Sequence, residues 1–208
     1  MHRRSLTIQA ASGGFTLIEL MVTITIIVLV TGIVMVRYSS FNSSVLLTGQ
    51  AYITAFDLRE AQSLAISVRG NGHEFREDYG IYVNMATQEK YILFQDDNDN
   101  GDYSPARYDA GEEVGNPYTL DPRFTIENIC AENSAGRTCY ADDPDTTGEV
   151  VDPSLSTLAI TFKRPDFDAA FYTPAKSNIQ SVDIIIAPHD GELEKKVVVY
   201  ASGQISVE

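Results

Sequence analysis

Oxygen-bearing side chains are densest at residues 96–103, where the chain reads Asp-Asp-Asn-Asp-Asn-Gly-Asp-Tyr. Asp96, Asn98 and Asn100, with the glycine that follows, match the opening of the Asp-x-Asx-x-Asx-Gly calcium loop, whose alternate oxygens converge on one ion. The twelfth position of such a loop is Arg107, where a calcium loop carries a bidentate glutamate. We expect either a calcium site on these residues or, as the alternative, a solvated turn held by Asx hydrogen bonds.

Cys130 and Cys139 are the only two cysteines, nine positions apart in a polar segment. A zinc site would need two more good ligands, and His73 and His189 are distant in the sequence. If this part of the chain is exported, the pair is expected to form a disulfide; in a reducing compartment, two free thiols are the alternative. Closing a loop of this size stabilises a fold by about 2–3 kcal/mol in the chain-entropy model.

Catalytic signatures are absent from the sequence. It has no nucleophile elbow, P-loop, dinucleotide fingerprint or zinc-protease helix. His73 follows Gly-Asn-Gly and His189 lies in Pro-His-Asp-Gly, and both contexts are typical of loops. We therefore expect no enzymatic activity, and no cofactor beyond the calcium considered above.

One acidic residue, Glu19, stands inside the apolar run of residues 15–36. As a helix this run would be about 33 Å long, which matches a hydrocarbon core of about 30 Å. A secretory signal peptide would have a shorter apolar region, of about 7–15 residues, and a small-residue cleavage site. A carboxylate in lipid is costly without a partner, so Glu19 is a candidate functional residue.

The charges that flank the run set its expected orientation. Arg3 and Arg4 precede it, and acidic residues dominate after it. The positive-inside rule leaves the N-terminus in the cytoplasm and sends the remaining chain outward.

Residues 14–20, Gly-Phe-Thr-Leu-Ile-Glu-Leu, resemble the prepilin signature of type IV pilins and type II secretion pseudopilins at every position of the motif. The resemblance implies that a prepilin peptidase cuts between Gly14 and Phe15 and methylates the new N-terminal amine of Phe15. It also implies that Glu19, in a filament, accepts the charged amine of a neighbouring subunit's Phe15, because a buried charge is tolerated only when paired.

Several further expectations follow from this resemblance. Residues 1–14 would be a cleaved leader, and their loss would leave 13 basic against 29 acidic residues, a net charge of −16. The partners would be other pilins or pseudopilins in a filament, the prepilin peptidase and an inner-membrane assembly platform. The protein would cross the bacterial inner membrane once, with its C-terminal head in the periplasm or outside the cell.

The helical pattern continues beyond the apolar run to about residue 69. Ile53, Phe56, Leu64 and Val68 recur near helical spacing, with small apolar residues beside them. No proline interrupts residues 15–69, and Gly-Asn-Gly at 70–72 stops the helix. The sequence therefore predicts one long helix, with a transmembrane or filament-core part at residues 15–36 and an amphipathic continuation at 37–70.

Residues 71–208 are expected to form a β-rich head, because their pattern changes to short strand-like runs separated by turn residues. The predicted strands are 74–83, 90–95, 124–129, 158–163, 181–187, 195–201 and 204–207, the last two joined by a tight hairpin at Ser202 and Gly203. No strand–helix alternation follows the long helix. The expected fold class is α+β, a pilin-like helix packed on antiparallel sheet.

Three segments of the head are similar to the GspH/FimT group of minor pseudopilins: residues 58–66, 161–166 and 197–207. Residues 128–154 look like a local elaboration. This group often carries an Asp/Asn/Gly turn followed by Gly-Glu-Glu, here Gly111, Glu112 and Glu113, which favours the turn over the calcium site.

The resemblance predicts a minor pseudopilin of a type II secretion system, part of a short periplasmic filament that helps to export folded proteins. The alternative is a minor pilin of a type IV pilus, used in adhesion, motility or DNA uptake. A net charge of −14 and a pI near 4.5 argue against nucleic-acid binding. Uptake receptors related to FimT need basic residues near the terminal hairpin, and residues 202–208 contain none.

Overall fold

The computed structural model describes residues 14–67, 78–96, 107–141, 150–163, 167–189 and 193–208, and of residues 36–42 only the backbone. The boundary between two compact units falls between Asn42 and Ser43. We describe each unit by itself: the N-terminal part of the long helix, and the head, which comprises the described residues from Ser43 to Glu208.

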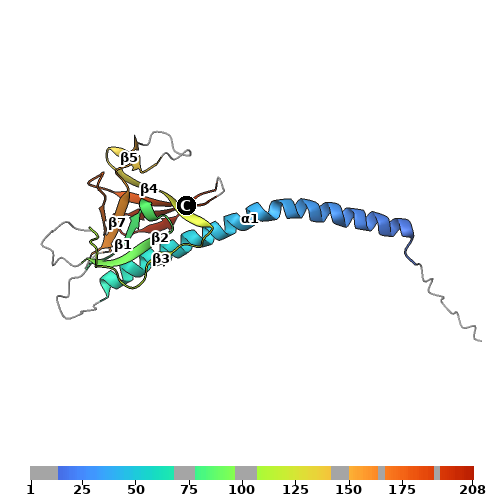
Figure 1. The fold of residues 1–208 in the computed structure, drawn as a ribbon, viewed down its shortest axis with the longest axis horizontal. Helices are drawn as coiled ribbons and strands as arrows, with labels where there is room; N and C mark the ends of the chain where they lie inside the picture. The colour runs from blue at the N-terminus through green and yellow to red at the C-terminus, as the bar shows by residue number, and fades with distance from the viewer. Residues whose placement is uncertain (1–13, 68–77, 97–106, 142–149, 164–166, 190–192) are drawn as a thin grey trace, which may run out of the picture. The chain divides into compact units, whose positions relative to one another are not determined.

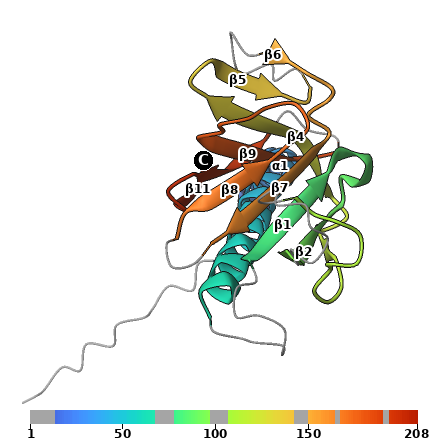
Figure 2. The same ribbon diagram turned by 90° about the vertical axis from the view of Figure 1, so that its left-hand side faces the viewer.

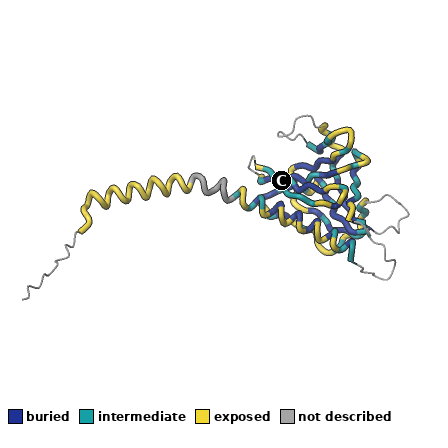
Figure 3. The backbone as a smooth tube through the Cα atoms, turned by 180° about the vertical axis from the view of Figure 1, so that it is seen from behind, coloured by how far each residue is buried: buried dark blue, intermediate teal, exposed yellow. Residues whose placement is uncertain are grey.

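Helix α1 runs unbroken through Leu17–Ile66, as the absence of proline predicts (Figure 1). Its stretch Leu17–Met35 has a mean hydropathy of 2.6, is long and apolar enough to cross a membrane, and consists of exposed residues throughout (Figure 3). The helix ends at Ile66, and the next residue, Ser67, donates its N–H to Ser63 O at 3.0 Å and its hydroxyl to Leu64 O at 2.9 Å. The end lies a few residues before the predicted one.

The described part of the head contains eleven strands and one 3₁₀ turn, η1 (Met85–Thr87). The strands are β1 (Asp78–Asn84), β2 (Lys90–Asp96), β3 (Tyr118–Thr119), β4 (Phe124–Asn133), β5 (Gly136–Cys139), β6 (Val150–Val151), β7 (Thr157–Phe162), β8 (Ala169–Tyr172), β9 (Ser181–Pro188), β10 (Lys195–Tyr200) and β11 (Ile205–Val207).

These strands form two sheets (Figure 2). The first has the order β3-β2-β1-β7-β8, and all of its pairs are antiparallel. The second has the order β11-β10-β9-β4-β5-β6, and only β5 and β6 pair in parallel. The α+β class is therefore confirmed, with a mixed edge on the second sheet.

The C-terminal part of α1 packs into the core between these sheets through a stripe of small residues. Buried along the helix are Leu47, Ala51, Ala55, Leu58, Ala61 and Ala65. They share one core cluster with inward-facing residues of both sheets, among them Ile81, Ile160, Val182, Ile184 and Val197. The larger residues of the same pattern, Ile53 and Phe56, are exposed on the outside.

Seven predicted strands correspond to β1, β2, β4, β7, β9, β10 and β11 within a few residues; residues 74–77 of the first lie outside the described part. Four strands were not predicted: β3, β5, β6 and β8. The largest difference is around Cys130 and Cys139, in the part of the chain expected to be a polar local elaboration, where β4 extends to Asn133 and the chain turns back as β5. Contacts from distant parts of the chain, described below, hold this hairpin.

Candidate assembly and processing site

The predicted processing and assembly residues lie together at the start of α1. Phe15 is 85% exposed and lies two residues before the first helical residue, Leu17. Glu19 is exposed in the first turn, one helical turn after Phe15. The Thr16 hydroxyl accepts a hydrogen bond from the Glu19 N–H at 3.3 Å, and Thr16 O accepts one from the Leu20 N–H at 3.2 Å.

Two threonines farther along this part of the helix bond to the backbone of the same helix. The Thr23 hydroxyl donates to Leu20 O at 2.9 Å, and that of Thr25 donates to Met21 O at 2.8 Å. Hydroxyls satisfied in this way are tolerated in lipid. Glu19 is the one charged side chain of Leu17–Met35.

Residues 10–35 match a known family, described as the prokaryotic N-terminal methylation motif. The chain carries a prepilin-type N-terminus. The match supports a type IV pilin-like protein and implies assembly with other pilins and processing by a prepilin peptidase. No curated protein and no solved structure matches the chain.

The exposed side of the head helix carries four large apolar side chains, which we call the helix stripe: Val45, Tyr52, Ile53 and Phe56, each more than half exposed. Their spacing of 7, 8 and 11 residues from Val45 puts them on one side of an α-helix. Large exposed apolar side chains that share one side of a helix mark an interaction site more often than scattered single residues do.

The C-terminal end of the head helix holds the terminal hairpin. Arg59 Nη2 donates to Ile205 O at 3.3 Å. Gln62 Nε2 donates to Gly203 O at 3.0 Å and to Phe167 O at 3.3 Å. Gly203 has φ +77°, and a Cβ at this position would lie 1.7 Å from Phe167 O. The predicted tight turn at Gly203 is therefore also a close contact with the segment before β8.

Two tyrosine–carboxylate pairs join the head helix to the first sheet. The Tyr91 hydroxyl donates to buried Asp57, and the Tyr118 hydroxyl donates to Glu60 at 3.0 Å. The two tyrosine rings stack at 5.5 Å. Burial raises the pKa of Asp57, against the lowering effect of the Tyr91 hydrogen bond, and burial together with Glu60 raises the pKa of Tyr118 to about 12. Sequence reasoning missed these pairs, because Asp57 and Glu60 read as ordinary solvent-facing charges.

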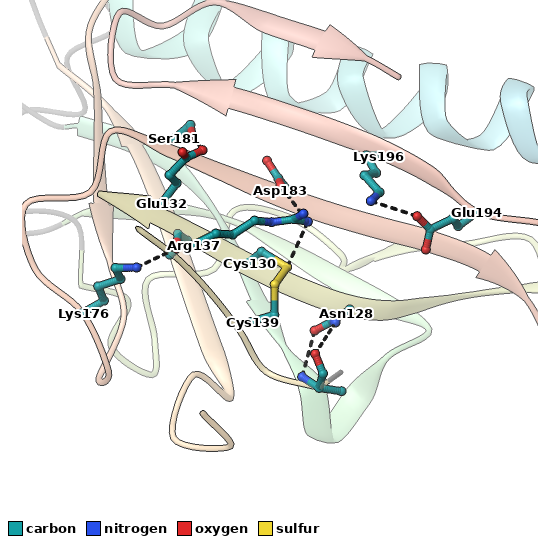
Figure 4. A network of polar contacts seen from close by, with 12 residues as sticks. Asn128, Cys130, Glu132, Arg137, Cys139, Lys176, Ser181, Asp183, Glu194 and Lys196 are labelled. Atoms are coloured by element: carbon teal, nitrogen blue, oxygen red, sulfur yellow. Dashed lines mark hydrogen bonds and ion pairs between the residues drawn. A yellow bond between two sulfur atoms is a disulfide. The ribbon is translucent and has the colours of Figure 1, made fainter. Parts of the chain in front are cut away.

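Cys130 and Cys139 are directly opposite each other in β4 and β5 and are joined by a disulfide (Figure 4). The predicted bridge thus crosses a hairpin. Both sulfurs are buried in a small cluster with Ile185 of β9, apart from the main core.

Three contacts beside the disulfide fix the same hairpin, also in Figure 4. Asn128 exchanges two hydrogen bonds with the backbone of Ala141, at 2.8 and 3.0 Å. Arg137 Nη2 lies 3.1 Å from Asp183 Oδ2. Lys176 Nζ donates to Ala131 O, to the Thr138 hydroxyl and to Gly136 O at the start of β5. The sequence gives no signal for Lys176, which lies about 40 positions from its acceptors.

Burial shifts the pKa of two charges in this network. It raises the pKa of Asp183, although the neighbouring Arg137 and Lys196 act in the opposite direction. It lowers the pKa of Lys176. These partly buried charges constrain the conformation of the β4–β5 hairpin, because a charge removed from water is tolerated only beside its partner.

The predicted calcium ligands are not brought together within the described residues. Asp96 is buried at the end of β2, whereas Asn98 and Asn100 lie outside the described residues. Among described residues no cluster of three or more metal-ligating side chains occurs. Calcium stays a prediction, tested by comparing the melting temperature with calcium and with a chelator.

The turn after this segment uses its acids for hydrogen bonds within the protein. Asp109 N–H donates to Glu112 Oε2 at 2.8 Å, and Gly111 N–H and the Tyr108 hydroxyl donate to Glu113. The Tyr108 ring stacks on Tyr82 at 4.3 Å, which places the turn against the first sheet. These bonds belong to the Gly-Glu-Glu end of the segment, whereas the predicted Asp/Asn/Gly turn before it lies, apart from Asp96, outside the described residues.

Of the two histidines that follow the leader, His73 lies outside the described residues, and His189 is exposed just after β9. His189 lines a hollow of about 520 Å³ with Gln88, Lys90 and Thr125 among others. This hollow includes none of the residues singled out above for assembly, calcium or the disulfide. The family that matches the N-terminus is structural, not enzymatic.

Proposed function

We propose that this protein is a minor pseudopilin of a type II secretion system, assembling into a short periplasmic filament that helps to export folded proteins. The observation that carries the proposal is the methylation motif with Glu19 one helical turn after Phe15, in an apolar helix of membrane-spanning length. The role is one of assembly and contact, without catalytic turnover.

The apolar N-terminal part of α1 accounts for insertion of the protein in a membrane before assembly. Leu17–Met35 crosses the inner membrane once, with the leader in the cytoplasm and the head in the periplasm or outside the cell. A charged Glu19 in hydrocarbon costs on the order of 2.5–3.5 kcal/mol on insertion scales, less near a helix end. This cost favours any state in which its carboxylate finds a cation.

Cleavage between Gly14 and Phe15 supplies that cation as a new N-terminal amine, which stays basic when methylated. In the filament the amine of one subunit pairs with Glu19 of its neighbour. Since both charges leave water, only the stagger that pairs them is stable, and the pair selects the correct axial register.

The helix stripe supplies a second contact. Its four side chains are exposed in the single chain, and packing against neighbouring subunits would remove their apolar surface from water at about 25 cal/mol per Å². The stripe and the N-terminal charges belong to the same helix, α1.

The decisive experiment replaces Glu19 in cells that make the filament. Glu19→Ala is expected to be inserted and cleaved normally but to enter the filament more than about tenfold less than the wild type, because a buried ion pair loses one partner. Thr25→Ala is the matched control, since its hydroxyl bonds only to its own helix. Normal incorporation of Glu19→Ala would refute the assembly role.

A deletion separates the secretion system from the alternative, a type IV pilus. Loss of secreted folded proteins with pili intact supports the proposal. Loss of pili, adhesion or motility with secretion intact would instead show that the protein is a minor pilin of a type IV pilus. A DNA-uptake role is disfavoured because residues 202–208 carry no basic side chain and the processed chain has a net charge of −16.

A further inference from the structure

The hollow of about 520 Å³ in the head lies between strands of the two sheets. One wall runs from Ala86 in η1 to Lys90 at the start of β2, and the other is formed by Thr125 at the start of β4 and His189 just after β9. Its volume is within the range of about 300–1,000 Å³ that is typical of ligand sites. Because it includes neither the N-terminal assembly residues nor the helix stripe, a ligand here would add to the proposed function.

Backbone hydrogen bonds fix the walls of this hollow. Gln88 O accepts a bond from the Ile126 N–H at 2.8 Å, and Glu89 O accepts one from the Leu120 N–H at 2.9 Å. The Thr125 hydroxyl also donates to Gln88 O, at 3.4 Å. The chain between β1 and β2 is therefore tied to β4 and to the segment that leads into it. A site whose backbone is held in advance loses little conformational entropy when a ligand binds.

The polar side chains that line the hollow have no partner of their own. Within the part of the chain that the structure describes, no side-chain hydrogen bond or ion pair is made by Gln88, Glu89, Lys90 or His189. Most other basic side chains of the described head lie beside a carboxylate, in the pairs Arg107–Asp109, Arg123–Asp121, Arg137–Asp183, Lys163–Asp78 and Lys196–Glu194. Lys90 is thus an available cation in a chain with 29 acidic and 15 basic residues.

The available groups include both donors and acceptors. The Lys90 ammonium and the His189 imidazole offer N–H groups, the Glu89 carboxylate accepts, and the Gln88 amide does both. A ligand carboxylate would form a charge-assisted hydrogen bond with Lys90. A phosphodiester backbone has no N–H group to give to Glu89, whose charge would repel it. A peptide with an acidic side chain offers both a carboxylate and main-chain N–H groups.

We propose that this hollow binds an extended peptide segment of another protein through one acidic side chain of that segment. The carboxylate of the segment lies against Lys90 and His189, and its main-chain N–H groups donate to Glu89 and to the Gln88 side chain. Glu89, Lys90 and His189 are all exposed, so a segment of another protein can reach them.

Three matched peptides test the chemistry of this site. The probe is acetyl-Gly-Gly-Glu-Gly-Gly-amide, and the comparison peptides carry glutamine or lysine in place of the glutamate. Binding to the cleaved full chain in detergent micelles is measured by NMR, through the amide signals of residues 86–90, 125 and 189. The glutamate peptide is expected to shift these signals saturably, and the glutamine peptide to bind about two- to fivefold more weakly, as the loss of an exposed ion pair requires.

Two substitutions at Lys90 connect this preference to the hollow. Lys90→Gln is expected to weaken binding of the glutamate peptide about two- to fivefold and to leave that of the glutamine peptide unchanged. Lys90→Glu is expected to bind the lysine peptide better than the glutamate peptide, a gain that a misfolded chain would not show. Lys195→Gln is the matched control, because Lys195 also has no side-chain partner among described residues but lies outside the hollow.

Four results would each overturn the proposal. The first is the absence of a saturable shift with the glutamate peptide. The second is equal binding of the glutamate and glutamine peptides, which would mean that the hollow does not recognise the carboxylate. The third is equal weakening by Lys90→Gln and Lys195→Gln, which would assign the effect to the general charge of the head. The fourth is the same set of shifts with sodium acetate at the same concentrations, because the hollow would then take a free anion and not a peptide segment.

Discussion

Replacing Gly203 by alanine should destabilise the head for two reasons that can be measured separately, the backbone conformation at Gly203 and its close contact with Phe167. In Gly203→Ala the alanine would have to adopt φ +77°, and its Cβ would lie 1.7 Å from the carbonyl oxygen of Phe167. Gly115→Ala meets φ +78° with nothing within 4 Å of the new Cβ. The two variants therefore share the same conformational cost, and only Gly203→Ala adds the clash.

The magnitudes follow from these two parts. A left-handed conformation costs an alanine about 1 kcal/mol, and this is the whole effect expected for Gly115→Ala. In Gly203→Ala the carbonyl of Phe167 must also move, which disturbs both bonds from Gln62 Nε2, each worth about 1 kcal/mol. The expected loss is about 3 kcal/mol, or about 6–12 °C in Tm against about 2–4 °C for the control.

The assay is thermal unfolding of the cleaved full chain in detergent, followed by the circular dichroism of the strands. A Gln62→Ala background completes the experiment: there Gly203→Ala should cost only about 1–2 kcal/mol, because the Gln62 bonds are already lost. Equal losses for Gly203→Ala and Gly115→Ala would refute the reasoning, since the contact with Phe167 would then impose no constraint.

Two further predictions concern the head. Burial raises the pKa of Asp57, so the folded chain binds a proton at this carboxylate more tightly than the unfolded chain does. The protonated carboxyl therefore stabilises the fold at pH values below the ordinary pKa of 3.8. This stabilisation is lost as the pH rises through the raised pKa of the folded state. Asp57→Asn, which keeps an acceptor for Tyr91, should therefore melt at or above the wild-type temperature near neutral pH, with the difference shrinking on acidification; a difference that grew in acid would contradict this. Replacing Cys130 and Cys139 together by alanine should cost about 2–3 kcal/mol in denaturant unfolding, and thiol titration of the exported wild-type protein should find no reactive thiol; two reactive thiols would contradict the disulfide.

The sequence predicted those parts of the fold that depend on local pattern. The apolar run and the absence of proline predicted one helix, and α1 is continuous through Leu17–Ile66. Short strand-like runs separated by turn residues predicted strands of the core such as β7 and β9. Gly203 was recognised as a turn residue because glycine and serine separate two strand-like runs.

The parts that were missed depend on partners far away in the chain. The β4–β5 hairpin looks polar because Arg137 and its neighbours are hydrophilic, yet Asp183 and Lys176, both more than 35 positions from Arg137, hold it in place. Two of the other missed strands, β3 and β6, are only two residues long, too short for any alternation to appear. The side of the head helix that faces the core was also not evident, because alanines pack inward and the larger Phe56 stays outside.

Because alanines face the core and larger apolar residues face outward, different residues of the head helix serve the stability of the fold and contact with other molecules. Ala55 and Ala61 pack the core, and Gln62 holds the terminal hairpin, so substitutions there act through the folded head. Tyr52 and Phe56 have most of their surface exposed, and their substitution removes few contacts from the single chain. Exposed large apolar side chains are costly in water, and another molecule that covers them would remove that cost at about 25 cal/mol per Å². The head helix thus has the composition expected of a subunit whose neighbours complete its packing.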